Sequence, residues 1–388
     1  MRRDYQYIVL GLGGLGSAAA YWLARRAGAD VLGLERFELG HARGESEDHS
    51  RIIRLSYHTT AYVELAKRAY QCWQLVEEEA REALVEITGG LDLGPRESAI
   101  PLDPYLDSLN AAGVRYERVS ALDIMRRWPP FRLSDDIHGI FQEHGGFVKA
   151  LLANAAHRRL AREHGASLLD RAPVTTIAAD GDEICLTAGG ESYRCQKLII
   201  AAGPWSNQPL GFLGVELPLQ VTREQVTYFA APDLRLFSPE RFPVWIWMDD
   251  PCFYGLPTFG EPGVKVGQDV GGQVTTADGR DFVPDPEYLA RVERFLGRYL
   301  PGALGPAHTT KTCLYTLTPD RDFVIDAVPG HPNALVAIGA GHAFKFASVI
   351  GRILAELAID GRTPSDLAPF TIDRPILRHS NPPVSYLI

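Results

Sequence analysis

The feature that most constrains this chain is a glycine-rich turn near its N-terminus. A short apolar strand predicted over residues 7–10 leads directly into a Gly-x-Gly-x-x-Gly turn at residues 11–16. Apolar residues at helical spacing follow over residues 17–26, and residues 29–35 are predicted as a second strand that ends in Glu35. Strand, glycine turn, helix, strand and carboxylate, in this order and within about 30 residues, form the fingerprint of a dinucleotide-binding unit.

Each part of this unit has a physical role in holding a pyrophosphate. Gly11 permits the tight turn, Gly13 lets the backbone approach the phosphates, and Gly16 lets helix and strand pack closely. The helix N-terminus offers unpaired N–H groups to the phosphates, and Glu35 accepts hydrogen bonds from a ribose diol. A glycine turn without a nucleotide is the alternative, but the complete unit argues against it. The segment predicts an ADP-containing ligand and by itself does not separate FAD from NAD.

Composition and charge narrow the class of protein. The chain has 388 residues, 46% of them hydrophobic, a net charge of −9 and no run of five Lys or Arg, so we expect no nucleic-acid partner. It lacks both the roughly 18 continuous apolar residues of a membrane span and an export signal. Five widely spaced cysteines predict neither a disulfide framework nor a metal site. These features predict a cytoplasmic enzyme without metal.

Two arginines follow a polar loop at residues 44–48. Arg51 and Arg54 are three residues apart, so on one turn of helix they would share a face and could bind neighbouring parts of one anionic ligand. The common alternative is a pair of surface arginines in salt bridges. A helical run is predicted next, over residues 62–79.

The middle of the chain combines a helix with many short strands. Residues 150–164 predict an amphipathic helix, and an apolar strand over residues 197–202 runs into a second glycine turn at Gly203. Such a returning strand suits a nucleotide-binding domain made of discontinuous pieces. Over residues 218–270 apolar and polar residues alternate, which predicts an antiparallel sheet that is polar on one face and forms the wall of a substrate cavity.

The C-terminal third completes a series of spaced motifs. A strand predicted over residues 334–338 leads through residues 339–346 into a long helix that ends near Ile359. Taken in order, the motifs resemble the monomeric sarcosine oxidase family of flavoproteins, within the D-amino-acid-oxidase-like superfamily. The resemblance runs nearly end to end and is carried by residues 11–16, 50–54, 202–205 and 254–257, Lys265, Cys313 and residues 344–346.

The resemblance implies an α/β fold with two domains. A discontinuous Rossmann-like FAD-binding domain is expected over residues 1–82, 147–215 and 310–388. A substrate domain, mainly antiparallel β-sheet with flanking helices, is expected over residues 83–146 and 216–309. The cofactor implied is FAD, bound covalently by a thioether from Cys313 to the 8α carbon of the flavin. Without the resemblance, Cys313 would be read as an inert buried thiol.

The resemblance also implies roles for individual residues. Arg54 and Lys345 clamp the substrate carboxylate, Lys265 lies close to flavin N5 and promotes oxygen reduction, and Tyr254 and Tyr315 form cavity walls. Arg51 lies next to the ring, and Arg51, Tyr254, Lys265 and Asp269 are the catalytic candidates. The cofactor-binding residues implied are Gly11, Gly13, Gly14, Leu15, Gly16, Glu35, Arg36, Ser50, Arg51, Val174, Gly203, Trp205, Cys313, Gly341, His342, Phe344 and Lys345.

The cationic candidates have ordinary interpretations as well. Lys345 lies early in an apolar helix, where a lysine usually extends to the surface, although its phenylalanine neighbours favour a cavity. Lys265 alternates with two valines and so also suits the wet face of a strand. A positive helix end near Gly341 would stabilise negative charge on the flavin pyrimidine.

The family reaction oxidises the secondary amine of an amino acid such as sarcosine by hydride transfer to flavin N5. It passes the electrons to O2 to give hydrogen peroxide, and the imine then hydrolyses. The resemblance further implies a monomer whose partners are a small amino acid amine and O2.

Three departures from the family pattern leave the substrate open. Asp269 replaces a histidine, Glu47 aligns with another histidine while His49 lies close, and Ala343 replaces a glycine. An acid at position 269 would favour a cationic group or accept a proton, and would repel a second carboxylate. Cyclic imino acids such as proline or pipecolate, and glycated amino acids, are alternative substrates. A dehydrogenase with another electron acceptor and a non-catalytic flavin-binding subunit are alternatives of other classes, and an NAD-dependent dehydrogenase is the weakest.

Overall fold

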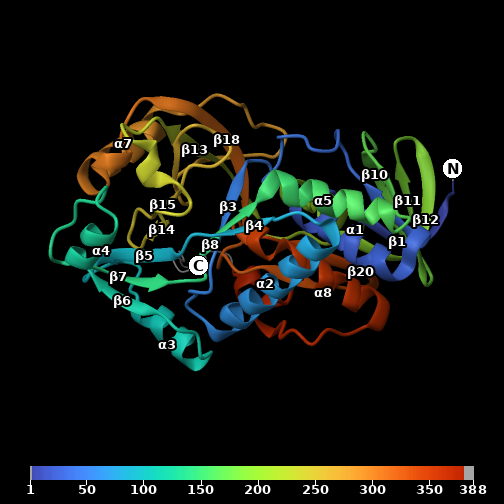
Figure 1. Ribbon diagram of the computed structural model, residues 1–388. Helices are drawn as coiled ribbons and strands as arrows, with labels where there is room; N and C mark the ends of the chain where they lie inside the picture. Colours follow the sequence, from blue (N-terminus) through green and yellow to red (C-terminus); the bar gives the residue numbers. More distant parts are fainter. Residues whose placement is uncertain (1, 380–388) are drawn as a thin grey trace.

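Two large β-sheets at opposite ends of the molecule organise the chain (Figure 1). The computed structural model describes residues 2–379. A small third sheet and a group of helices lie between the two ends (Figure 1). The predicted α/β class, with a Rossmann-like part and a mainly antiparallel part, is confirmed.

The first large sheet is built around the predicted N-terminal unit. Strand β1 (Asp4–Leu10) lies between β2 and β12 and is parallel to both. The parallel strands β2, β9, β12 and β20 span Val31–Leu34, Ser167–Leu169, Glu191–Ile200 and His331–Ile338. Three antiparallel additions, β10, β11 and β19, span Val174–Asp180, Glu183–Ala188 and Val324–Val328. The core strands are buried on both faces, as a parallel sheet covered by helices requires.

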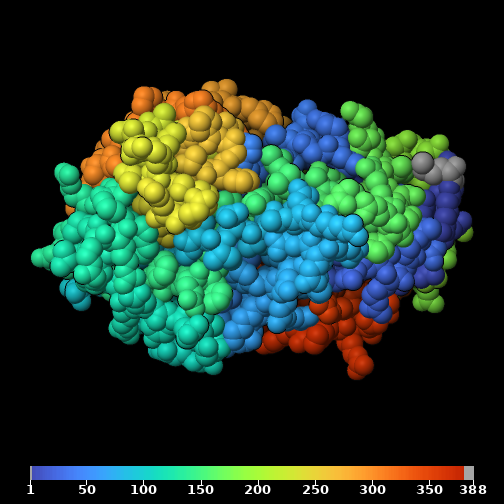
Figure 2. Space-filling view, in the orientation of Figure 1, coloured from blue at the N-terminus to red at the C-terminus, as the bar shows by residue number. Residues whose placement is uncertain are grey.

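Helices cover this sheet beside the glycine turn. Helix α1 (Gly14–Ala27) contacts both α5 (Ala150–Glu163) and α8 (Ala347–Asp360), and α2 (Thr60–Ala80) packs against α8. Gly351 permits the closest approach, since a Cβ there would lie 2.5 Å from the backbone carbon of Ala18. On the face drawn in Figure 2, the light-blue segment that contains α2 covers the middle of the molecule.

The second large sheet has nine strands in the order β17-β13-β16-β15-β14-β5-β7-β6, with β18 also paired to β13. Strands β5, β6, β7, β13 and β14 span Gly90–Pro95, Glu117–Ser120, Ile137–Gln142, Gln220–Phe229 and Val244–Trp247. Strands β15, β16, β17 and β18 span Phe253–Leu256, Val264–Gln268, Gln273–Thr275 and Ala307–Leu317. Helices α3, α4, α6 and α7 span Asp103–Ala111, Ala121–Arg127, Asn207–Phe212 and Pro286–Tyr299.

The strands predicted over residues 218–270 are present and one face of their sheet forms the wall of a cavity, as expected, but that face is not uniformly polar. All four residues of β14 are buried. On one face Trp245 stacks on Phe295 of α7 with ring centroids 5.7 Å apart. On the other face Ile246 and Tyr254 line an internal cavity. This face therefore meets a cavity, and its residues combine apolar and aromatic side chains with Lys265 of β16.

The small sheet corrects the helical interpretation of the two arginines. Strand β3 (Ser50–Ile53) is antiparallel to β8 (Gly146–Lys149), which also pairs with β4 (Val85–Ile87). Successive side chains of a strand point to opposite faces, so residues three apart diverge. Arg51 and Arg54 therefore do not share a face.

The C-terminal helix also begins later than expected. Helix α8 starts at Ala347, and a single 3-10 turn over residues 343–346 precedes it. The positive end of the α-helix therefore lies one turn beyond Gly341.

The predicted domain boundaries stay a prediction. Strand β18, which they divide at residue 310, is hydrogen-bonded along β13 from Ala307 to Leu317.

Among residues 2–379, none of the helices combines the length and apolar character needed to cross a bilayer. Within the same residues, no three His, Cys, Asp or Glu side chains are grouped to hold a metal ion.

Candidate active site

The glycine turn has the tight geometry that its sequence predicts. Gly11 has a φ of +85°, in the region that favours glycine. A Cβ at Gly16 would lie 1.8 Å from the carbonyl oxygen of Gly11, so no side chain fits between helix and strand there. The amide of Gly14 at the start of α1 donates to Ser46 Oγ at 2.9 Å. The turn thus presents backbone, without side chains, at the carboxyl end of β1.

A cavity of about 350 Å³ opens at this end of the parallel sheet. Its position is the one at which open α/β sheets bind ligands. It brings together nine of the residues predicted to bind the cofactor, namely Gly11, Gly13, Gly14, Leu15, Glu35, Arg36, Val174, Gly203 and Trp205. Arg36 and Trp205 are joined through Asp278, at 3.3 Å and 2.8 Å respectively.

Glu35 is buried at the end of β2 with 6% of its surface exposed. Its carboxylate accepts the amides of Leu12 at 2.8 Å and Phe37 at 3.1 Å, and His41 Nε2 lies 3.3 Å away. Burial opposes the charge, but His41 and the two amides prevail and hold the pKa of Glu35 below its usual value. Glu35 is therefore an ionised acceptor beside the cavity.

A second cavity of about 120 Å³ continues from the first. Both are lined by Gly14, Leu15, Glu45, Ser46 and Gly339. The second cavity brings together ten further candidate residues, namely Ser50, Arg51, Tyr254, Lys265, Asp269, Tyr315, Gly341, His342, Phe344 and Lys345. Its apolar wall adds Ile246, Cys252 and Leu256.

Lys345 lines the second cavity and forms no ion pair with any residue that the structure describes. Within residues 2–379, no carboxylate lies within 4.0 Å of its ammonium nitrogen. Burial, followed by the charge of nearby Arg54, lowers the pKa of Lys345 to about 7. The Trp73 indole donates to the Lys345 carbonyl at 2.8 Å and so fixes the backbone. Lys345 is a cation available to an anion that enters the cavity.

Lys265 also lines the second cavity, and its environment differs. Its residue is 2% exposed, so the interpretation as a wet-face lysine was wrong. The ammonium forms an ion pair with Asp48 and donates to the Ser50 carbonyl at 2.7 Å. Burial lowers the pKa of Lys265 to about 8, and Asp48 opposes that shift.

Arg51 holds the polar loop that contributes Glu45 and Ser46 to the lining of both cavities. Its guanidinium donates to the carbonyl oxygens of Glu45, Glu47 and Ser50 at 2.9, 3.1 and 3.0 Å. It also lies 3.4 Å from Asp48 Oδ2. These contacts explain why a half-buried arginine beside the cavity keeps one orientation.

Arg54 is not brought into the cavity lining. Its side chain is 2% exposed and lies 2.9 Å from Asp92 Oδ1 on β5. Ser56 donates to the other oxygen of Asp92. The charge of Arg54 is therefore offset by Asp92. Of the two residues predicted to clamp the substrate carboxylate, Lys345 lines the second cavity and Arg54 does not.

Asp269 lines the cavity, but its charge is also offset. Arg321 donates to its Oδ2 at 2.7 Å, and both side chains are less than a tenth exposed. The sequence-based expectation that Asp269 attracts a cation and repels a carboxylate treated it as a free charge. The ion pair with Arg321 removes most of that net charge.

Comparisons with known proteins show the family to which the chain belongs. Residues 6–357 match the family described as FAD dependent oxidoreductase (DAO). The chain belongs to this family. It is 33% identical to monomeric sarcosine oxidase of Bacillus sp. (strain NS-129) over 97% of this chain and 99% of that protein. It is 36% identical to N-methyl-L-tryptophan oxidase of Salmonella agona (strain SL483), over 95% and 99%. The open form of NikD, an unusual amino acid oxidase, is 28% identical with a TM-score of 0.84, covering 100% of this chain and 99% of NikD.

The residues of this FAD-dependent oxidoreductase fit its cofactor. Gly11, Gly13 and Gly14 line the first cavity, where the backbone of the turn can approach a pyrophosphate, and Glu35 is ionised beside them. The second cavity continues from the first past Gly14 and Leu15, so an extended dinucleotide can reach Lys265 and Lys345. Gly16 packs against β1 and lines neither cavity.

Cys313 lies on β18 and is not one of the residues that line the second cavity. It pairs in register with Glu224, and it precedes the cavity-lining Tyr315 by two residues, which places both on one face of the strand. Burial raises the pKa of Cys313 to about 11, and Arg51 and Arg280 oppose the shift. Cys313 is thus close enough to Arg51 for their charges to interact.

Several residues of the site were missed from the sequence. Glu45 lines both cavities, accepts the Thr316 amide at 2.5 Å, and has its pKa raised to about 7 by burial. The polar loop at residues 44–48 was a visible signal for Glu45, Ser46 and Asp48, but Asp92 and Arg321 had none. Glu47 lines the first cavity, whereas His49 lines neither and bonds to Glu261 at 3.1 Å.

Proposed function

We propose that this chain oxidises the secondary amine of N-methyl amino acids and passes the electrons to O2, giving hydrogen peroxide and an imine that hydrolyses. The observation that carries the proposal is the ammonium of Lys345. It lines the second cavity, and among residues 2–379 it has no carboxylate partner. Such a group binds the carboxylate of an amino acid by a charge-assisted hydrogen bond.

The surroundings of Lys345 suit a neutral amine with a single carboxylate. FAD, when bound, supplies the two-electron chemistry that accepts a hydride and reduces O2. Arg54 and Asp269 are each held by an opposite charge, so neither changes the net charge that a substrate meets. Ile246, Leu256 and Tyr254 offer apolar contacts to an N-alkyl group or an apolar side chain. Sequence relatives named for sarcosine and N-methyl-L-tryptophan support this substrate class.

We assign oxygen activation to Lys265 and the flavin bond to Cys313. Lys265 is a buried ammonium in the same cavity, and an ammonium attracts the negative charge that develops as O2 is reduced. Cys313 lies on the strand face of Tyr315 and interacts with Arg51, which supports a position beside the flavin. We further propose a monomer, as the name of the sarcosine oxidase relatives states of them. All five cysteines lie within residues 2–379 and none of them forms a disulfide there, which supports the cytoplasm.

An amine panel tests the proposal directly. Purified protein is supplied with sarcosine, N-methyl-L-tryptophan, L-proline, L-pipecolate and a fructosyl amino acid, and peroxide release is measured. We expect the N-methyl amino acids to give the highest kcat/KM. A preference for proline or pipecolate would move the proposal to cyclic imino acids, and reduction of the flavin without peroxide would move it to another electron acceptor.

The flavin bond has its own experiment. After acid precipitation, the yellow colour should stay with the wild-type polypeptide and should appear in the supernatant of the Cys313→Ser variant. Cys252→Ser is the control, because it removes a thiol that lines the second cavity and leaves Cys313 in place. Flavin released from the wild-type protein would exclude the covalent bond.

A further inference from the structure

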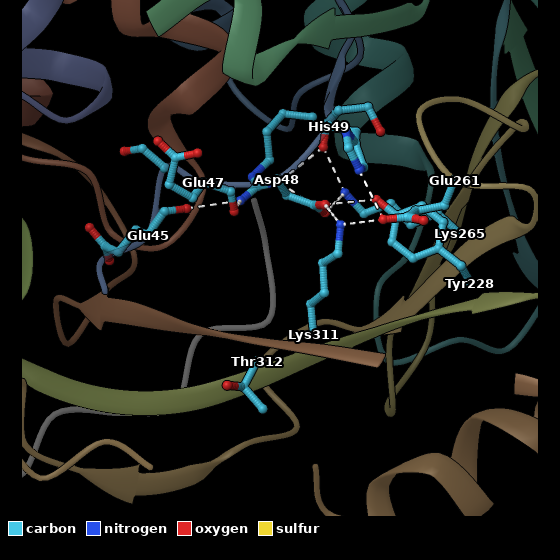
Figure 3. Close-up of polar contacts among 12 residues, drawn as sticks. Glu45, Glu47, Asp48, His49, Tyr228, Glu261, Lys265, Lys311 and Thr312 are labelled. Carbon is cyan, nitrogen blue, oxygen red and sulfur yellow. Dashed lines mark hydrogen bonds and ion pairs between the residues drawn. The ribbon is translucent and has the colours of Figure 1, made fainter. Parts of the chain in front are cut away.

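Asp48 is a buried carboxylate that no part of the proposed reaction uses. It lies in the loop before β3 with 7% of its surface exposed. Its carboxylate forms an ion pair with Lys265, accepts the Tyr228 hydroxyl at 2.7 Å, and lies 3.4 Å from Arg51. Figure 3 shows Asp48 among its partners, with Lys265 and Tyr228 labelled. The three partners come from different strands, Arg51 from β3, Tyr228 from β13 and Lys265 from β16.

A second group of charges continues from Asp48 toward the surface. Lys311 of β18 lies 3.6 Å from Asp48 Oδ1 and 2.8 Å from Glu261 Oε1. His49 lies 3.1 Å from the same Glu261 oxygen, and the side chains of Lys311 and Glu261 are 34% and 22% exposed. Figure 3 shows Lys311 and Glu261 on the side of Asp48 away from Glu45 and Glu47. The charge of Lys311 is therefore compensated mainly by Glu261, and the charge of Asp48 compensates that of Lys265.

The charged and titratable groups that face Lys265 come from every element around it. They are Asp48 in the loop, Arg51 on β3, Tyr228 on β13 and Cys313 on β18. Asp48 is the only anion among these four at neutral pH, because Arg51 is a cation and burial holds the hydroxyl of Tyr228 and the thiol of Cys313 neutral. Although burial opposes its charge, Lys265 and Arg51 hold the pKa of Asp48 well below its usual range.

A buried ammonium keeps its proton only where an anion or acceptor favours the charged form. Without Asp48, Lys265 would keep the Ser50 carbonyl as acceptor, but its charged neighbour would then be the like-charged Arg51. The position of Asp48 is therefore decisive for the charge of Lys265.

We propose that Asp48 is a positioning residue that holds Lys265 at the cavity wall as a cation, and thereby sets the pH range in which the reduced enzyme reacts with O2. This inference rests on the role of Lys265 in the proposed function. Asp48 touches neither cavity, so its effect passes through Lys265. The reductive half-reaction, which depends on Lys345 and the substrate, is expected to be independent of Asp48.

The experiment measures the two half-reactions of the holoenzyme separately by stopped flow. In the Asp48→Asn variant, anaerobic reduction by sarcosine or N-methyl-L-tryptophan should keep its wild-type rate. Reoxidation by O2 should decline from a lower pH, because the charged form of Lys265 is lost earlier. A shift of the midpoint by about one pH unit makes reoxidation about tenfold slower above both midpoints.

Three further variants separate positioning from a general structural effect. Asp48→Glu restores the charge and should return the midpoint toward the wild-type value. Glu261→Gln, in the same cluster but without contact to Lys265, should leave the midpoint unchanged. Tyr228→Phe removes the hydroxyl that fixes Asp48 and should shift the midpoint in the direction of Asp48→Asn, which keeps the test decisive if that variant does not fold.

Thermal unfolding of the holoenzyme gives a readout apart from activity. The double variant D48N/K265M should lose less stability than the sum of its single variants, since the two side chains act as one pair. Additive losses, or equal slowing of both half-reactions with an unchanged pH midpoint, would overturn the inference. Failure of the proposed function is distinct, because the wild-type enzyme would then release no peroxide with any amine of the panel.

Discussion

Replacing Lys345 with methionine should weaken substrate binding and strengthen the fold at once. The ammonium lines the cavity without a carboxylate partner, and burial together with Arg54 lowers its pKa from 10.5 to about 7. At about 1.4 kcal/mol per pKa unit, holding this lysine costs the folded protein at most roughly 4 kcal/mol at pH 7. Methionine has a similar length and no charge, so we expect Lys345→Met to recover about 1–3 kcal/mol, or about 1–4 °C in Tm for a chain of this size.

The loss of binding follows from the same ammonium. A hydrogen bond to a charged group contributes about 1.5–3 kcal/mol, so KM should rise about 10- to 150-fold. The free ammonium is charged below about pH 7 and neutral above it. The wild-type enzyme should therefore lose affinity for a carboxylate as the pH rises through 7, and Lys345→Met should bind weakly at every pH.

The assay combines thermal unfolding with titration by methoxyacetate, a carboxylate that lacks the amine and so adds no titration of its own. Lys265→Met is the matched control, because it also removes a buried ammonium but takes from the buried Asp48 carboxylate the ion pair with Lys265. That control should lower the Tm where Lys345→Met raises it. The reasoning is refuted if Lys345→Met lowers the Tm, or binds methoxyacetate as tightly as the wild-type protein.

Three further variants address the glycine turn and the supports of the cavity. Gly16→Ala places a Cβ 1.8 Å from a backbone oxygen and should abolish flavin incorporation, measured as the flavin-to-protein ratio of the purified protein. Trp73→Phe removes the donor to the Lys345 carbonyl and leaves a buried acceptor unsatisfied, at about 1–3 kcal/mol, so KM should rise and the Tm should fall in parallel assays. Asp92→Asn removes the partner of Arg54, which should destabilise the protein by up to about 3–5 kcal/mol in urea unfolding while binding methoxyacetate more tightly.

The first cavity was predictable because the residues that indicate it are close together in the sequence. The glycine turn, the helix after it and Glu35 lie within one short segment, and their roles follow from backbone geometry and hydrogen bonding. The alternation over residues 218–270 likewise predicted strands correctly. Alternation does not tell whether a given residue of the second face meets water or a cavity, and this explains why Lys265 was ambiguous in the sequence.

Arg51 and Arg54 show where local reasoning fails. Spacing alone suggested a shared helical face, but pairing of residues 50–53 with β8, about a hundred residues later, makes the segment a strand. Tertiary pairing overrides local spacing in such short segments. The two side chains then meet different partners, Arg51 the loop carbonyls and Arg54 the Asp92 carboxylate.

The distribution of charge around the cavity could not be predicted, because each ion pair joins residues distant in sequence. Arg54 meets Asp92 across 38 residues and Arg321 meets Asp269 across 52. Each pair on its own is neutral, so a list of the cationic residues alone overstates the positive charge that a substrate meets. Among the lysines that line the second cavity, Lys265 has Asp48 and Lys345 has no carboxylate partner. A buried cation without a counter-charge lowers the stability of the fold, and a bound carboxylate offsets that loss. At Lys345 the requirements of substrate binding and of folding therefore oppose each other.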